Sequence, residues 1–458
     1  MKPIVQKISL WILAAISFTF FISAKASISL GISLPESLTL SEAIKRAVDQ
    51  NPEIKAARFQ VEMIKSEVTQ ARSGFFPQIY FTETFNRTTN PMWATGAKML
   101  QGNLSQADFD LDELNDPEAI NNFTSAVSMS WSIYKGGQTW IGLKQAQQNH
   151  LAASLMLKRA GQEIISKTAK AYVGLLLAQE NLVVIVHALE TAKANLKMVR
   201  SRFETGFVVK SDFLRANVRI AELEQQRLEA ESQVKVAQAM LKAAMGITGN
   251  KPLYLVTPFK KCEETKGPVE RWINIALSNR SDLEKMRYQE DIAKKEIDKL
   301  RAGHLPDLEL VGNYEINSED YSDTENNYAI GAVMHLNLFS GHRISAKTEA
   351  AKSSFLRIQE FRKGMELNVS VQAQESFLKA QSAWKRIQVA KTAVDQAEEG
   401  LRIVRNRYNN GLLTIVGLLD AEVAYQQART NHFKALHDYK VARIQLALAA
   451  GTIDSDFQ

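Results

Sequence analysis

Cysteine is nearly absent from this chain, and several other chemical markers are missing with it. The 458 residues include one cysteine, Cys262, which cannot form a disulfide within the chain. The sequence contains no Gly-Lys-Ser/Thr phosphate loop and no His-Glu-x-x-His, and its seven histidines show no ligand spacing. We therefore expect no catalytic site, no metal and no cofactor.

Long hydrophobic runs are also missing beyond the N-terminus. The uncharged run Ile8 to Ala24 follows two lysines and ends at the small-x-small sequence Ala24-Lys25-Ala26. This run is short for a membrane anchor, which needs about 18 apolar residues, and serine and threonine interrupt it. We predict a cleaved signal peptide over 1–26. No other stretch approaches a transmembrane helix, so any bilayer contact is expected through strands or at the surface.

The net charge of the chain is small. The formal charge of +6 becomes +3 when the three lysines of the signal peptide are removed. Acidic and basic residues are interspersed on the long helices, which is typical of a solvated surface and not of a nucleic-acid partner.

Proline and glycine are rare in two long stretches, Gln138 to Glu204 and Arg343 to Asn409. Neither contains proline, and both are rich in Ala, Leu, Gln, Lys and Glu, which favour helices. At 1.5 Å per residue, each stretch predicts a helix of roughly 100 Å. A helix of that length does not fit a compact globule.

Alternating apolar and polar residues predict four strands. The first two are expected within 78–86 and about 123–133, separated by a long loop over 87–122, and the other two over 307–317 and 327–339. Apolar residues of one parity, such as Met129 and Trp131, alternate with serines of the other parity, so the two kinds point to opposite sides of the strand. A strand of this kind requires an apolar medium on one side and water on the other.

The order of these elements occurs twice. A capping box at Thr39-Leu-Ser-Glu42 opens the first short helix, and in the second half Ser281-Asp-Leu-Glu284 forms a capping box after the short helix Val269 to Ser278. We predict a first repeat over 27–250 with helices 138–204 and 211–245, a connector over 251–268, a second repeat over 269–451 with helices 342–409 and 415–450, and a tail over 452–458. In each half, two shorter helices placed end to end have nearly the length of the long one, so they are expected to lie beside it.

Four strands cannot close a membrane barrel, which needs about eight. Three chains supply twelve. The sequence therefore predicts a mixed fold, mostly α: a trimeric 12-stranded outer-membrane β-barrel that continues as a long periplasmic α-helical barrel.

The sequence motifs of this chain resemble those of the TolC family of outer-membrane factors. The resemblance covers nearly the whole mature chain and includes Ile133-Tyr-Lys-Gly-Gly137, Leu338-Phe-Ser-Gly341, Arg202-Phe-x-x-Gly206 and Arg407-Tyr-x-x-Gly411. It implies a passive exit duct in the outer membrane of a Gram-negative bacterium, serving efflux or type I secretion. The partners it implies are outer-membrane lipid, a periplasmic adaptor and an inner-membrane transporter of RND, ABC or MFS type.

The resemblance also implies roles for particular residues. Gly206, Phe207, Gly411 and Leu412 correspond to adaptor-docking tips. Asp212 and Tyr408 correspond to partners in a closing hydrogen-bond network, and Asp420 to a ring of pore carboxylates.

Two positions depart from the family pattern: Leu413 replaces the arginine of the network and Gly417 replaces a second acidic ring. A looser gate follows from these departures. Simpler interpretations stay open, because Asp212 suits any helix start, Asp420 suits a solvated helix face, and Tyr408 suits packing of the tip.

Two other kinds of protein share some of these features. A periplasmic adaptor is exported and has long helical hairpins, but it carries one hairpin and a β-sandwich. A soluble coiled-coil scaffold accounts for the long helices and leaves the strands without a role.

Overall fold

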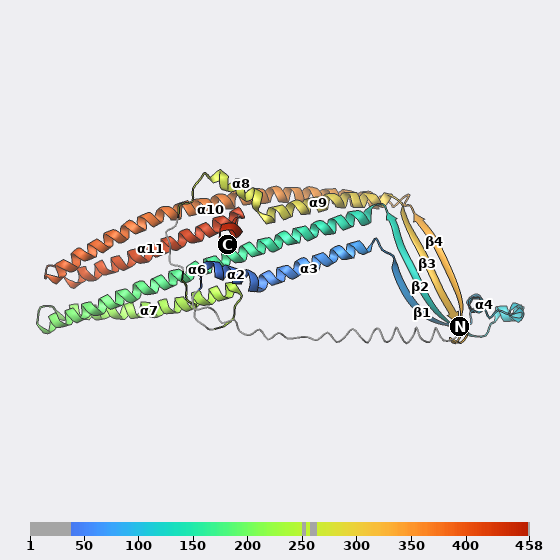
Figure 1. Cartoon of the computed structure of the whole chain (residues 1–458), viewed down its shortest axis with the longest axis horizontal. Helices are drawn as coiled ribbons and strands as arrows, with labels where there is room; N and C mark the ends of the chain where they lie inside the picture. The colour runs from blue at the N-terminus through green and yellow to red at the C-terminus, as the bar shows by residue number, and fades with distance from the viewer. Residues whose placement is uncertain (1–37, 250–252, 257–262, 457–458) are drawn as a thin grey trace.

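The computed structural model describes residues 38–249, 253–256 and 263–456. The expected signal peptide and Cys262 lie outside these residues. Figure 1 shows long helices running side by side, with a sheet at one end that is tilted against them.

The main helices and strands follow one another in the same order in both halves of the chain, while α4, η1 and α5 occur only in the first half and η2 and α12 only in the second. The first half contains α2 (Leu40–Gln50), α3 (Pro52–Ser73), β1 (Gln78–Thr88), α4 (Pro91–Leu100), η1 (Gln106–Phe109), α5 (Leu111–Asn115), β2 (Ile120–Lys135), α6 (Gln138–Glu204) and α7 (Lys210–Met245). The second contains α8 (Val269–Asn279), α9 (Ser281–Arg301), η2 (Ala302–His304), β3 (Asp307–Ser318), β4 (Glu325–His335), α10 (Arg343–Asn409), α11 (Ile415–Ala450) and α12 (Ile453–Asp456).

The two long helices α6 and α10 are continuous over 67 residues each. Helices α3 and α7 both pack along α6, and α9 and α11 both pack along α10 (Figure 1). The side-by-side arrangement expected from helix lengths is therefore present in both halves. Each long helix and the helix that follows it form a hairpin, and we call these the α6/α7 hairpin and the α10/α11 hairpin.

The four strands form one antiparallel sheet in the order β1-β2-β3-β4. The register aligns apolar residues across it, since Ile79 pairs with Met129, Met129 with Gly312, and Gly312 with Ile330. The opposite face is polar: Ser128 Oγ donates to Asn313 Oδ1 at 2.9 Å. The outer strands β1 and β4 each keep one edge unpaired among the residues that the structure describes.

The buried core lies where the shorter helices meet halfway along the long ones. Tyr172, Leu175, Leu241 and Met245 belong to one cluster there. At the end of α7, Gly246 has φ +71°, and a Cβ on it would lie 2.7 Å from the Asn51 Cα. Only glycine fits this left-handed cap against the turn between α2 and α3.

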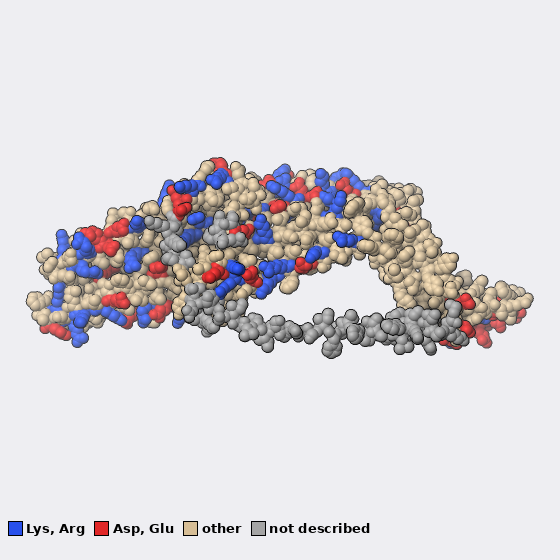
Figure 2. Space-filling model, in the orientation of Figure 1, with Lys and Arg blue, Asp and Glu red and all other residues tan. Residues whose placement is uncertain are grey.

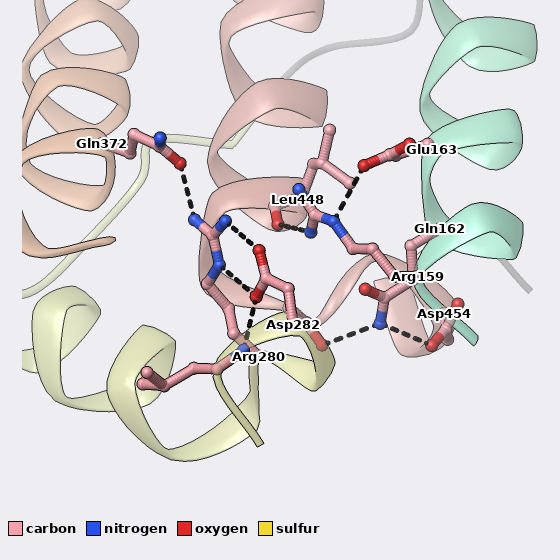
Figure 3. A network of polar contacts seen from close by, with 10 residues as sticks. Arg159, Gln162, Glu163, Arg280, Asp282, Gln372, Leu448 and Asp454 are labelled. Atoms are coloured by element: carbon pink, nitrogen blue, oxygen red, sulfur yellow. Dashed lines mark hydrogen bonds and ion pairs between the residues drawn. The ribbon is translucent and has the colours of Figure 1, made fainter. Parts of the chain in front are cut away.

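A polar network joins the other helix ends at the same level (Figure 3). Arg280, between α8 and α9, holds Asp282 and donates to Gln372 of α10, while Arg159 of α6 donates to the Leu448 carbonyl of α11. Gln162 of α6 donates to Asp454 of α12 at 2.9 Å. These contacts connect α6, α9, α10, α11 and α12 where the chain ends.

Several expectations need correction. Strand β4 ends at His335 and not at 339, because its partner β3 begins at Asp307, directly after Pro306, which has no N–H to donate. The segment 87–122 is not an open loop: it contains α4, η1 and α5, and Gln101 anchors it by donating to the Asn121 carbonyl.

The predicted capping box at Ser281-Asp-Leu-Glu284 is wrong. Helix α9 begins at Ser281 itself, with Arg280 as a cap residue that makes no side-chain cap hydrogen bond. The Ser281 Oγ is buried and has no hydrogen-bond partner among the described residues. The network around Arg280 and Asp282 sets this helix start. At Thr39 the expected box is present.

The expectation that no further stretch resembles a membrane span also fails. Helix α6 contains one 18-residue window with mean hydropathy 1.6. In the structure α6 packs against α2, α3, α7, α9 and α11, and buries Tyr172, Val173 and Leu175 among them. About a third of the apolar window is buried in the described chain.

Candidate functional site: the helix tips

Each hairpin turns at the end far from the sheet through the same backbone motif (Figure 1). The Phe207 amide donates to the Arg202 carbonyl at 2.8 Å, and the Leu412 amide donates to the Arg407 carbonyl at 2.9 Å. Gly206 and Gly411 have φ of +79° and +74°. Both turns are Schellman caps, which leave the next residue projecting from the tip.

The tips are apolar outside and packed inside. Phe207 is 83% exposed and Leu412 is 73% exposed. Behind them a buried cluster joins both hairpins, made of Val199, Ala216, Leu401, Tyr408, Ile415 and Leu418. Exposed apolar side chains on such a fixed base are suited to contact another protein.

Arg202 links the two hairpins directly. This α6 residue donates to the carbonyls of Tyr408 at 3.2 Å and Asn409 at 3.0 Å, both in the last turn of α10. Its guanidinium also lies over the Tyr408 ring, 5.0 Å from the centroid. A cation at the C-terminal end of a helix stabilises the exposed carbonyls there. We call this contact the Arg202 clamp.

Tyr408 lies under that clamp, and Asp212 lies close by. The ring is buried, and its hydroxyl has no hydrogen-bond partner among the described residues, so no Tyr408–Asp212 hydrogen bond is formed within this chain. Burial raises the pKa of the Tyr408 hydroxyl; the Arg202 charge opposes this, and the Asp212 carboxylate adds to it. The carboxylate is therefore near the ring without binding its hydroxyl.

Asp420 is exposed on α11, and no ion pair of its side chain is found in the described part of the chain. Leu413 lies exposed in the second tip, and a Cβ added to Gly417, in the first turn of α11, would meet nothing within 4 Å. The structure describes one chain, so whether three Asp420 side chains meet in a pore stays a prediction.

A second link between the hairpins centres on Glu422. Asn195 of α6 donates to Glu422 Oε1 at 2.6 Å, and Arg405 of α10 lies 3.7 Å from the same oxygen. Burial raises the pKa of Glu422, opposed by the Asn195 hydrogen bond and by the charges of Arg405 and Arg219. This carboxyl group is thus held between α6, α10 and α11.

A third link joins α7 to α11. Arg219 donates to Gln426 at 2.6 Å, and Gln426 donates to Gln226 at 3.0 Å. Beside these residues lies a groove of about 530 Å³ between the hairpins, which Glu422 and Leu401 also line. In the parts of the chain described here, no group of three His, Cys, Asp or Glu is arranged to hold a metal.

Sequence reasoning missed Arg202, Glu422 and Arg219 as linking residues. In the sequence Arg202 is only the first residue of a tip motif, although a basic residue one turn before a helix end suits that helix or a neighbouring one. Glu422 lies two residues beyond Asp420 and so points to a different side of α11. No local signal distinguishes it from other helical glutamates.

Comparison with known proteins gives consistent matches along the chain. The profile of the family described as "Outer membrane efflux protein" matches residues 43–247 and 272–452. The Outer membrane protein TolC of Vibrio cholerae is 24% identical over 423 residues, which cover 90% of this chain and 91% of that protein. The proteases secretion protein PrtF of Dickeya chrysanthemi is 22% identical, with 93% and 91% covered.

Solved structures agree in fold. The open state of the MtrE outer membrane channel of Neisseria gonorrhoeae superimposes with a TM-score of 0.74 at 17% identity, covering 92% of this chain and 90% of that one. The outer membrane protein VceC of Vibrio cholerae gives a TM-score of 0.72 at 18% identity, covering 90% and 96%.

Proposed function

Because this chain belongs to the outer membrane efflux protein family, we propose that it works as a passive exit duct in the outer membrane of a Gram-negative bacterium. One observation carries the proposal: the four-stranded sheet has one apolar face, one polar face and two edges left unpaired among the described residues. Three such sheets joined edge to edge provide twelve strands, enough to close a barrel with lipid outside and water inside.

The polar face supports a water-filled lumen. Thr124 donates to Asn317 Oδ1 at 2.8 Å and Ser128 to Asn313 Oδ1 at 2.9 Å, so hydroxyl and amide groups of β2 and β3 pair on that side, while the Asn317 Nδ2 has no partner among the described residues. Helices α6 and α10 extend the duct by about 100 Å at 1.5 Å per residue. In this arrangement the helices are periplasmic and an energy source lies in an inner-membrane transporter.

The helix tips are the surface we assign to a periplasmic adaptor. The support is the exposure of Phe207 and Leu412 above the two Schellman turns at Gly206 and Gly411. Replacing Phe207 and Leu412 with serine removes apolar contact area without disturbing the buried cluster. We expect weaker cross-linking to a purified adaptor from the same organism, with an unchanged melting temperature; Met156→Ser, an exposed apolar residue of α6, is the matched control.

The same tips are assigned as the gate. Asp212 and Tyr408 are assigned to this gate and Asp420 to a ring of pore carboxylates, with Tyr408 contributing its buried ring and not a hydrogen bond of its hydroxyl. The Arg202 clamp supplies a cation between the hairpins, although Leu413 occupies the position where the family pattern has arginine. A gate in this chain therefore depends on Arg202, with Asp212 acting on the Tyr408 ring through its charge.

The alternative of a periplasmic adaptor is not retained. Four strands of this chain lie in one open sheet with two helical hairpins, whereas an adaptor carries a β-sandwich and one hairpin. Membrane fractionation tests the function: the protein should float with the outer membrane and migrate as a trimer without boiling. A monomer in the soluble periplasmic fraction would refute it.

A further inference from the structure

Basic side chains surround the place where the helices meet the sheet. They come from four neighbouring helices, and we call them the basic collar: Arg72 of α3, Lys144 of α6, Lys299 and Arg301 of α9, and Arg343 and Lys347 of α10. Figure 2 shows blue atoms, with some red ones among them, over the helix ends next to the strands, while the visible face of the sheet carries almost no charge. The collar therefore borders an uncharged surface.

Few acidic groups compensate these charges. Arg72, Arg343 and Lys347 form no ion pair with any residue that the structure describes. Lys299 pairs with Glu296 of its own helix at 3.4 Å, and Arg301 has only an exposed contact at 3.7 Å with Asp298. Farther along the helices the pairing is closer, as in the 2.7 Å contact between Arg362 and Glu290. The collar retains a net positive charge that an anionic partner can use.

Three members of the collar line one pocket between α9 and α10. This pocket of about 290 Å³ is lined by Lys299, Arg343 and Lys347, together with the amides Gln138 and Asn337. Cationic and amide N–H donors around one cavity recognise a phosphate group. The first turns of α6 and α10 contain no acidic residue, so the positive ends of both helix dipoles add to this preference.

Exposed apolar side chains lie beside the pocket. Leu338 is 88% exposed and Phe339 is 78% exposed, both in the segment that joins β4 to α10. On the neighbouring helix Trp140 is 59% exposed, with the Lys144 Nζ 5.4 Å from its ring. Aromatic and apolar groups next to cations are typical of the boundary between lipid tails and headgroups.

We propose that the pocket between α9 and α10 binds the phosphate headgroup of an anionic phospholipid in the periplasm-facing leaflet of the outer membrane. The acyl chains then lie against Leu338 and Phe339, continuous with the apolar face of the sheet. The inference rests on the proposed function, in which the sheet spans that membrane and the helices are periplasmic. The opposite end of the sheet carries the acidic segment that contains Asp108, Asp110, Asp112, Glu113, Asp116 and Glu118. The end of the sheet next to the helices is therefore basic and the opposite end is acidic, which sets the two leaflets apart.

The test measures lipid binding to the full-length trimer in detergent, with fluorescent phosphatidylglycerol and phosphatidylcholine as probes. The test variant is the triple substitution Lys299→Gln, Arg343→Gln and Lys347→Gln. Each cation near an anionic surface contributes about a fivefold change in affinity, so the three together predict roughly a hundredfold weaker phosphatidylglycerol binding. The preference should also weaken with added salt.

The matched control removes three exposed cations far from the strands: Lys385→Gln, Lys391→Gln and Lys434→Gln. This control should keep the wild-type preference for phosphatidylglycerol. An unchanged preference in the test variant would overturn the proposal.

Inorganic phosphate separates the lipid from a free anion. Complete displacement of the lipid by a few millimolar phosphate would also overturn the proposal, because the apolar contacts would then contribute nothing. Membrane flotation of the same variants keeps the two ideas apart: a variant that still floats as a trimer leaves the exit duct intact whatever the lipid result.

Discussion

Replacing Arg202 with glutamine should separate the two tips. The substitution removes two charge-assisted hydrogen bonds, at 3.2 and 3.0 Å, and the contact of the guanidinium with the Tyr408 ring. A hydrogen bond to a charged group contributes about 1.5 to 3 kcal/mol when buried, and less when exposed as at Asn409. A cation–π contact near the surface contributes about 0.5 to 1 kcal/mol. Together the loss is about 2 to 3 kcal/mol per chain.

This loss corresponds to about a 30- to 150-fold shift in the ratio of joined to separated tips. The assay is single-channel conductance of the purified protein in planar bilayers. We expect a poorly conducting wild type and an Arg202→Gln variant with higher conductance or a larger open fraction. Arg200→Gln is the matched control, since Arg200 pairs with Glu204 of its own helix at 3.1 Å.

Two results would refute this reasoning. Equal conductance of Arg202→Gln and Arg200→Gln would show that the clamp does not hold the duct closed. A wild type that already conducts fully would show that the tips are not a barrier in this protein.

Three further predictions concern stability. Tyr408→Phe should leave conductance unchanged and raise the free energy of unfolding by up to about 1 kcal/mol, because the buried hydroxyl has no partner among the described residues. Glu422→Gln should stabilise the protein above about pH 4.5. Gly206→Ala and Gly411→Ala should each cost about 1 to 2 kcal/mol through positive φ alone, since no atom lies within 4 Å of the added Cβ, whereas Gly400→Ala within helix α10 should stabilise by about 0.5 to 1 kcal/mol.

The sign of the Glu422 prediction follows from the raised pKa. The folded protein binds the proton of this carboxyl group more readily than the unfolded chain, so stability falls as pH rises from the ordinary value of 4.5 through the raised pKa. Melting temperatures of the wild type and of Glu422→Gln, measured between about pH 4 and 8, should converge at low pH and separate as the pH rises. Curves that separate only in acid would contradict the raised pKa of Glu422. A destabilised Tyr408→Phe variant would contradict an unpartnered hydroxyl, and an unchanged stability of Gly411→Ala would contradict strain from positive φ.

Local signals in the sequence were sufficient for most elements. The bounds of α6 could be predicted because Gln138 to Glu204 lacks proline and is rich in strong helix formers. The two faces of the sheet followed from alternation alone, because successive strand residues point to opposite sides. Gly206 and Gly411 marked both tips, since few other residues adopt positive φ.

Other features depended on contacts between distant segments. Helix α9 begins at Ser281, which was predicted to cap it, because Arg280 and Asp282 take part in a network with α10. The end of β4 depended on where β3 begins, and helices within 87–122 depended on anchoring by Gln101. Local propensity does not contain these constraints.

The sequence by itself determined that this chain has two long helical hairpins, four two-faced strands and two matching tips. Helix and strand patterns repeat over a few residues, so they can be read from neighbours in the chain. The tertiary structure decided which side chains meet across the hairpins: Arg202 with the end of α10, Asn195 with Glu422, and Arg219 with Gln426. The partners in these pairs lie 206, 227 and 207 residues apart in the chain, and only the packing of whole helices brings them within hydrogen-bond distance.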